Sequence, residues 1–108
     1  MANVFKNTAA STSDDSYVAA VPGARIRVTA ISAVTGGTAT QVTFKSKPSG
    51  SSTAISPNYT FGANGGMVLP YNPDGWFDTA KGEGLTVTTG TGSTTGINVS
   101  YKLIYAAN

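Results

Sequence analysis

Apolar and polar side chains alternate along this chain in short segments, and turn residues close each segment. In residues 40–47, Val42 and Phe44 have the parity of one face, and Thr43 and Lys45 have the parity of the other. Successive side chains of a strand point to opposite faces, so this pattern is typical of a strand with one buried face. The chain shows no convincing 3.6-residue helical period.

Seven or eight such segments follow one another from Tyr17 onward. Turn signals recur roughly every eight to twelve residues, which is the spacing of all-β sandwiches and barrels. We therefore expect an all-β fold, an antiparallel β-sandwich or small barrel, with a jelly-roll-like arrangement that fits the strand number. The expected strands are residues 17–21, 25–34, 40–47, 54–56, 67–71, 75–80, 84–89 and 97–105.

The alternation slips once, within residues 25–34. Ile26 and Val28 share one parity, whereas Ile31 and Ala33 take the opposite one. An extra residue inserted in a strand shifts the parity in this way. The sequence therefore predicts a β-bulge or sheet-crossing bend near Ala30.

Residues 1–16 are small and polar, and Val4 and Phe5 are their bulky anchors. A segment of this composition buries too little apolar surface to fold alone. We therefore expect an extended N-terminal arm over residues 1–16 and a single β-sandwich domain over residues 17–108. Chain termini are usually poorly ordered unless they are tied down, so Val4 and Phe5 are candidate contacts with a neighbouring subunit.

The composition removes the residues on which many enzymes and metal sites depend. The 108 residues include no cysteine and no histidine, so thiolate ligands, disulfides and the usual general base near neutral pH are missing. The pairs Asp14/Asp15 and Asp74/Asp78 lack the spacing of a known calcium loop. We therefore expect no enzymatic activity, no metal and no cofactor.

The charges favour neither nucleic acid nor a membrane as partner. Seven basic and five acidic residues give a net charge of +2, which is too weak for nucleic acid as the main partner. No apolar run approaches the roughly 18 residues of a membrane span, and the first residues lack the apolar segment of a secretory signal. Arg25, Arg27, Lys45, Lys47 and Lys102 share an outward parity, which indicates either ordinary solvated charges or one positive docking face.

The stretch LPYNPDGWFDTAKGEG, residues 69–84, holds the only tryptophan and three of the five acidic residues. Residues 72–75, Asn-Pro-Asp-Gly, form a turn sequence because Pro presets φ and Gly accepts a positive φ. Trp76 and Phe77 point to opposite faces if they begin a strand, so we expect one in the core and the other at a partner contact or the domain end. Tyr71 is a further candidate contact.

The segments VPGARIRVTAISAV, TFGANGGMVLPYNPDGWFDTAKGEGLTVTT and INVSYKLIY resemble small structural proteins of tailed bacteriophages. The shared pattern ANGG…LPYNP.GWF.TA.GE.L covers Ala63 to Leu85, and the resemblance spans about residues 17–105. Two longer loops, KPSGSSTAISPNYTF and TGTGSTTG, depart from it.

This resemblance implies a capsid decoration, or cement, protein of the virion. Such a protein binds the major capsid protein outside the head at three-fold positions, often as a homotrimer, and stabilises the contacts between capsomers. Neighbouring subunits would be reached through the N-terminal arm. The resemblance transfers no site residue.

Three alternatives stay open. A carbohydrate-binding module on a head fibre or tail appendage would use Tyr59, Tyr71 and Trp76 against a sugar. A tail-tube or connector component would assemble as hexamers or twelve-fold rings. The last alternative is a glycoside hydrolase with Asp74 and Glu83 as its two carboxylates.

Overall fold

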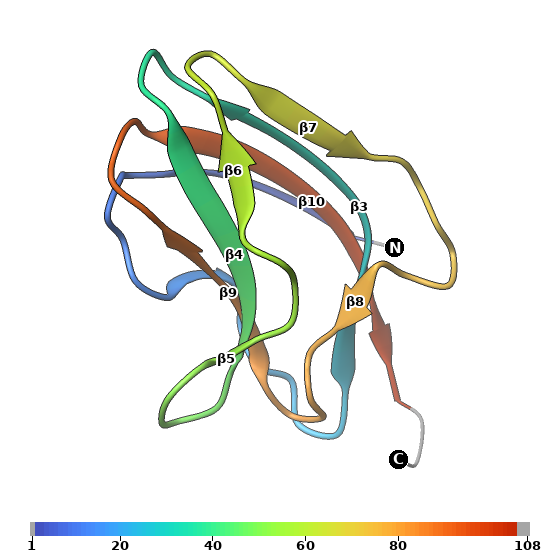
Figure 1. Ribbon diagram of the computed structural model, residues 1–108. Coiled ribbons are helices and arrows are strands. Elements are labelled where there is room, and N and C mark those ends of the chain that lie inside the picture. The colour runs from blue at the N-terminus through green and yellow to red at the C-terminus, as the bar shows by residue number, and fades with distance from the viewer. Residues whose placement is uncertain (1, 106–108) are drawn as a thin grey trace.

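The computed structural model describes residues 2–105, and these residues form two antiparallel β-sheets packed face to face (Figure 1). The predicted all-β fold is confirmed, and of the two architectures left open the structure shows the sandwich. The jelly-roll arrangement is not confirmed. No stretch of residues 2–105 forms a helix that is long and apolar enough to cross a membrane.

The first sheet contains the two longest strands of the protein. β10 (Thr95–Ile104) lies between β1 (Ala2–Thr8) and β3 (Arg25–Thr35). β3 also pairs with two short strands along its other side, β7 (Gly66–Leu69) and β8 (Phe77–Asp78). In Figure 1 the loop between β7 and β8 leaves the sheet and returns to it beside β3.

The second sheet covers the inner side of the first. β9 (Gly84–Thr89) lies between β2 (Asp15–Val18) and β4 (Thr40–Lys47). β4 continues the sheet through β5 (Thr53–Ala54) and β6 (Tyr59–Phe61), which pair with different parts of it. The predicted inward parity of Val42 and Phe44 is confirmed, because both side chains are fully buried between the sheets.

The β-bulge predicted near Ala30 is present. Ala30 lies opposite Ser100 of β10, but Val28 lies opposite Tyr101, so Thr29 is the extra residue of β3. The Thr29 hydroxyl donates to the Ser100 carbonyl at 3.1 Å. Val28 points into the core on one side of the bulge, and Ile31 does so on the other. The bulge thus lets this eleven-residue strand bury Ile26 and Val28 before it and Ile31 and Ala33 after it.

The extended arm expected over residues 1–16 is not confirmed. Ala2–Thr8 form β1, which pairs with β10 along its whole length, and Asp15–Val18 form β2 in the opposite sheet. The physical reason is that β10 offers a free edge of backbone donors and acceptors, which a polar segment can pair with although it buries little apolar surface.

Side-chain hydrogen bonds join β1 to β2 and close this side of the sandwich. The Tyr17 hydroxyl contacts the Thr8 hydroxyl oxygen at 2.6 Å and donates to the Lys6 carbonyl at 3.1 Å. Asp15 accepts from the Thr8 hydroxyl at 2.8 Å and forms an ion pair with Lys6. Thr8 and Tyr17 are buried, so these polar contacts stabilise the position of β1.

Replacing Tyr17 by Phe tests the β1–β2 contact. The variant leaves the Lys6 carbonyl and the Thr8 hydroxyl without their phenol partner, which we expect to lower the unfolding free energy by about 1–3 kcal/mol. Urea denaturation measures the loss, and hydrogen exchange should speed up in residues 2–8 first. Tyr71→Phe, at an exposed phenol, is the matched control. Equal stability of the two variants would show that the Tyr17 hydroxyl does not hold β1.

Alkaline pH should weaken the fold through the same side chain. Burial raises the pKa of Tyr17 above its ordinary value of 10.0, and the nearby Asp15 acts in the same direction. The unfolded chain therefore ionises first, so the unfolding free energy falls as the pH rises above about 10. Denaturation at a series of pH values should show a smaller fall in Tyr17→Phe; an identical fall would contradict this role for Tyr17.

Candidate docking face

One surface of the first sheet is built from the residues that alternate with buried ones. Ile97 and Val99 of β10 are buried, as are Ile31 and Ala33 of β3, so the residues between them point away from the core. The strand registers arrange these outward residues in rows across the sheet. We call this surface the outer face. Its rows are Asn3–Ser100–Ala30, Phe5–Asn98–Ser32–Val68 and Asn7–Gly96–Val34–Gly66.

The outer face is uncharged and carries protruding apolar side chains. Phe5 is 62% exposed, Val34 63% and Val68 71%, and Tyr71 at one end of the face is 55% exposed. These four are most of the large apolar side chains that are exposed among residues 2–105. The three rows contain no ionisable residue, whereas the next outward pair along β10 and β3, Lys102 and Arg27, is charged. Exposed apolar groups gathered on one face mark a binding surface more often than chance exposure does.

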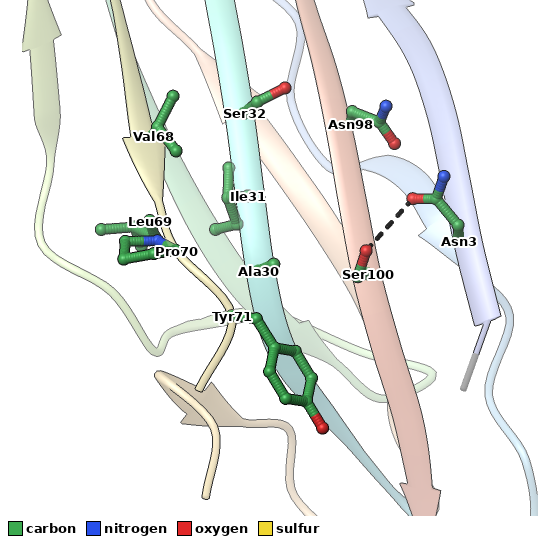
Figure 2. Close-up of a pocket in the computed structure, with 10 residues that line it drawn as sticks. All are labelled: Asn3, Ala30, Ile31, Ser32, Val68, Leu69, Pro70, Tyr71, Asn98 and Ser100. Atoms are coloured by element: carbon green, nitrogen blue, oxygen red, sulfur yellow. Dashed lines mark hydrogen bonds between the residues drawn. The ribbon is translucent and has the colours of Figure 1, made fainter. Parts of the chain in front are cut away.

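A shallow hollow of about 300 Å³ lies on this face. Figure 2 shows Val68 and Pro70 on one side, Asn3 and Asn98 on the other and Tyr71 at one end. A second hollow, of about 420 Å³, lies farther along the same face, between Phe5 and Val34. Ser32 and Asn98 line both hollows, so they occupy the middle of the outer face.

The segment that follows β7 holds Tyr71 at the end of the outer face. The turn predicted at residues 72–75 is present, because the Gly75 amide donates to the Asn72 carbonyl at 2.9 Å and Gly75 has a φ of 82°. The Asn72 amide donates to the Thr29 carbonyl at 2.9 Å. The indole Nε1 of Trp76 donates to the Pro70 carbonyl at 2.9 Å. These bonds fix the loop against β3.

Trp76 and Phe77 take opposite directions, as their parity predicts. The Phe77 ring packs on Phe44 in the core with a centroid distance of 5.3 Å. Trp76 stays 41% exposed, and its role as a partner contact remains a prediction. Phe77 is partly buried and packs against the core, and its role as a contact also remains a prediction.

The predicted positive face is divided between the two sheets. Arg25 and Arg27 belong to β3 and Lys102 to β10, whereas Lys45 and Lys47 belong to β4 of the opposite sheet. Because the two sheets present opposite outer surfaces, these charges form no single docking face.

Local partners hold the two arginines in place. Arg27 pairs with both carboxylate oxygens of Asp78 at 2.9 Å, and this hydrogen bonding raises the pKa of the guanidinium. Arg25 donates to the Thr79 carbonyl at 3.3 Å. A side chain at Gly75 would collide with Arg27, since a Cβ there would lie 2.4 Å from its Cγ. Gly75 therefore keeps the Arg27–Asp78 pair in place as well as forming the turn.

The remaining predicted residues do not gather at one site. Val4 turns toward the core and packs against it, while Phe5 lies on the outer face. Tyr59 belongs to β6 of the opposite sheet, where its ring meets Phe44 edge-on at 6.4 Å. The three aromatic residues of the proposed sugar-binding set are therefore not on one surface, and only Tyr71 borders the hollow.

The two carboxylates of the hydrolase alternative have different surroundings. Asp74 is exposed in the turn at residues 72–75, whereas Glu83 accepts a hydrogen bond from the Ser46 hydroxyl at 2.6 Å. A hydrogen bond from Ser52 is the main cause that lowers the pKa of Asp14. Within residues 2–105, no cluster of three or more acidic side chains could hold a metal ion.

Three important residues of the outer face were not predicted as contacts, namely Val34, Val68 and Asn98. The change in alternation within residues 25–34 could have identified Val34, because an extra residue at Thr29 turns Val34 outward when Ile31 and Ala33 face inward. Val68 and Asn98 could not be assigned, since only the strand order brings their strands beside β3.

Comparison with models of protein families, with curated proteins and with solved structures finds no match for this chain.

The opposite positions of Trp76 and Phe77 predict unequal effects of truncation. Phe77→Ala leaves a gap against Phe44, which we expect to cost about 2–4 kcal/mol of unfolding free energy. Trp76→Ala removes a half-exposed ring and one hydrogen bond, with an expected cost of about 1 kcal/mol. Urea denaturation of both variants measures the difference. A larger loss in Trp76→Ala would contradict this assignment of core and surface.

Proposed function

We propose that this protein is a capsid decoration protein of a tailed bacteriophage. It would bind the major capsid protein on the outside of the head at three-fold positions, as a homotrimer, and hold neighbouring capsomers together. The sequence resemblance suggests this role. The observation that carries it is the outer face, where Phe5, Val34 and Val68 protrude from a surface without charges.

The chemistry of the outer face suits contact with protein. The centres of protein interfaces are depleted of charged residues and enriched in aromatic ones. Phe5 and Tyr71 supply the aromatic groups, and the strands beneath them hold the surface rigid, so little conformational entropy is lost on binding.

The proposed role requires only binding. A protein that binds the assembled, expanded head more tightly than its precursor stabilises the expanded state by mass action. Many copies, each with a small contact, add such contributions over the whole head. Phe5 would make its contact from β1, within the sheet, rather than from a free arm.

A carbohydrate-binding module is the second candidate, and the hollow bordered by Tyr71 is the observation that favours it. The amides of Asn3 and Asn98 offer donors and acceptors beside an exposed phenol ring. An appendage with this function would be present in few copies.

The copy number and location of the chain in purified virions separate these functions. The decoration role predicts hundreds of copies on the head surface, measured by quantitative mass spectrometry and by electron cryo-microscopy of the particle. Heads that lack the protein should also lose their DNA at a lower temperature, and adding the purified protein should restore the original temperature. A handful of copies at a vertex or tail would refute the decoration role.

A further inference from the structure

The absence of charged residues from the three rows of the outer face makes a second copy of the same face an acceptable partner. Two copies of a charged surface repel when they approach each other, and like charges placed opposite each other cost several kcal/mol. The middle row, Phe5–Asn98–Ser32–Val68, and the rows beside it contain no ionisable group. These three rows can therefore face an identical set of rows without repulsion between charges of their own.

The polar groups of the outer face are also able to pair with themselves. An amide carries both donors and acceptors, and a hydroxyl carries both as well. Asn98 and Ser32 point out of the sheet in Figure 2, and no hydrogen bond joins them to the other residues drawn there. In a symmetric pair each amide could donate to its counterpart and accept from it, whereas a face of lysines or carboxylates could do only one of these.

The shape of the outer face also fits a second copy of itself. Ser32 and Asn98 lie between the two hollows, and the apolar side chains of Phe5 and Val68 protrude at the ends of the middle row. Small residues, including Ala30 and Gly96, leave room for the side chains of a facing sheet. Sheets pack face to face at about 10 Å when side chains interdigitate in this way.

We propose that the outer face is the contact surface for a second copy of this chain, with the two faces related by a two-fold axis near Ser32 and Asn98. Such an isologous pair joins two copies that belong to different trimers, because a three-fold ring uses two different surfaces for its contacts. On the head the pair would link neighbouring decoration sites, and the capsid protein would then be contacted by another surface of each copy. This setting rests on the proposed function, but the pairing itself does not.

The area of the face sets the expected strength. Four strands and three rows cover roughly 300–400 Å², well below the about 800 Å² that each partner buries in a stable complex. The pair should therefore form only at high protein concentration in solution. On a head surface, neighbouring copies are held close together, and their effective concentration is much higher.

Opposite charges placed at the centre of the face test the proposal. Ser32→Glu and Ser32→Lys each bring two like charges together in a symmetric pair, so each variant alone should associate at least about tenfold more weakly than the original protein. An equal mixture of the two variants should associate again, because Glu then faces Lys. Sedimentation equilibrium measures the doubling of mass as concentration rises, and denaturation curves verify that both variants fold.

Thr60→Glu and Thr60→Lys are the matched controls, because Thr60 is an exposed hydroxyl residue on β6 of the opposite sheet. They should leave association unchanged. Association of both Ser32 variants at the original strength would overturn the proposal, as would a loss that mixing does not restore. A protein whose mass never rises, but whose Ser32 and Asn98 amide signals shift on adding maltohexaose, would assign the face to a glycan instead.

Binding to purified heads, measured separately, distinguishes this proposal from the decoration role. Self-association that follows the charge pattern, without any binding to heads, would support the pairing and refute the decoration role. Binding to heads by a protein that never self-associates would support the decoration role and refute the pairing.

Discussion

The extra residue at Thr29 is the constraint on which the surface of this protein depends. Without it, β3 would keep one parity from Arg25 to Thr35, and either Ile26 and Val28 or Ile31 and Ala33 would face water. With it, both pairs are buried, and Ala30, Ser32 and Val34 are turned outward together. A single register shift in one strand thus creates the uncharged face and completes the core at the same time.

Polar contacts hold the edge of the sandwich together, whereas apolar burial stabilises its centre. β1 has few apolar side chains to bury, yet it is fixed by backbone pairing with β10 and by the hydrogen bonds of Thr8 and Tyr17. Asp15 and Lys6 neutralise each other in the same place. The charges of Lys6 and Asp15 therefore link β1 to β2. The outer surface of β1 presents Asn3, Phe5 and Asn7 instead.

The parity of single strands could be predicted from the sequence, and so could the bulge, the turn at residues 72–75 and the opposite directions of Trp76 and Phe77. These features depend on residues that are neighbours in the chain. The strand status of β1 could not be predicted, because it depends on the free edge that β10 provides. The outer face was found only in part, since Phe5, Val34 and Val68 come from three separate segments that tertiary pairing brings together.

The pairing of β1 with β10 also affects how the protein is made. Val4 of β1 pairs with Val99 of β10. The first sheet therefore cannot be completed until nearly the whole described chain has left the ribosome. Contacts between such distant residues slow folding, because a long loop must close before they contribute any stability. During this delay the edge of β3 that later pairs with β10 stays open, and open strand edges in incompletely folded chains favour aggregation.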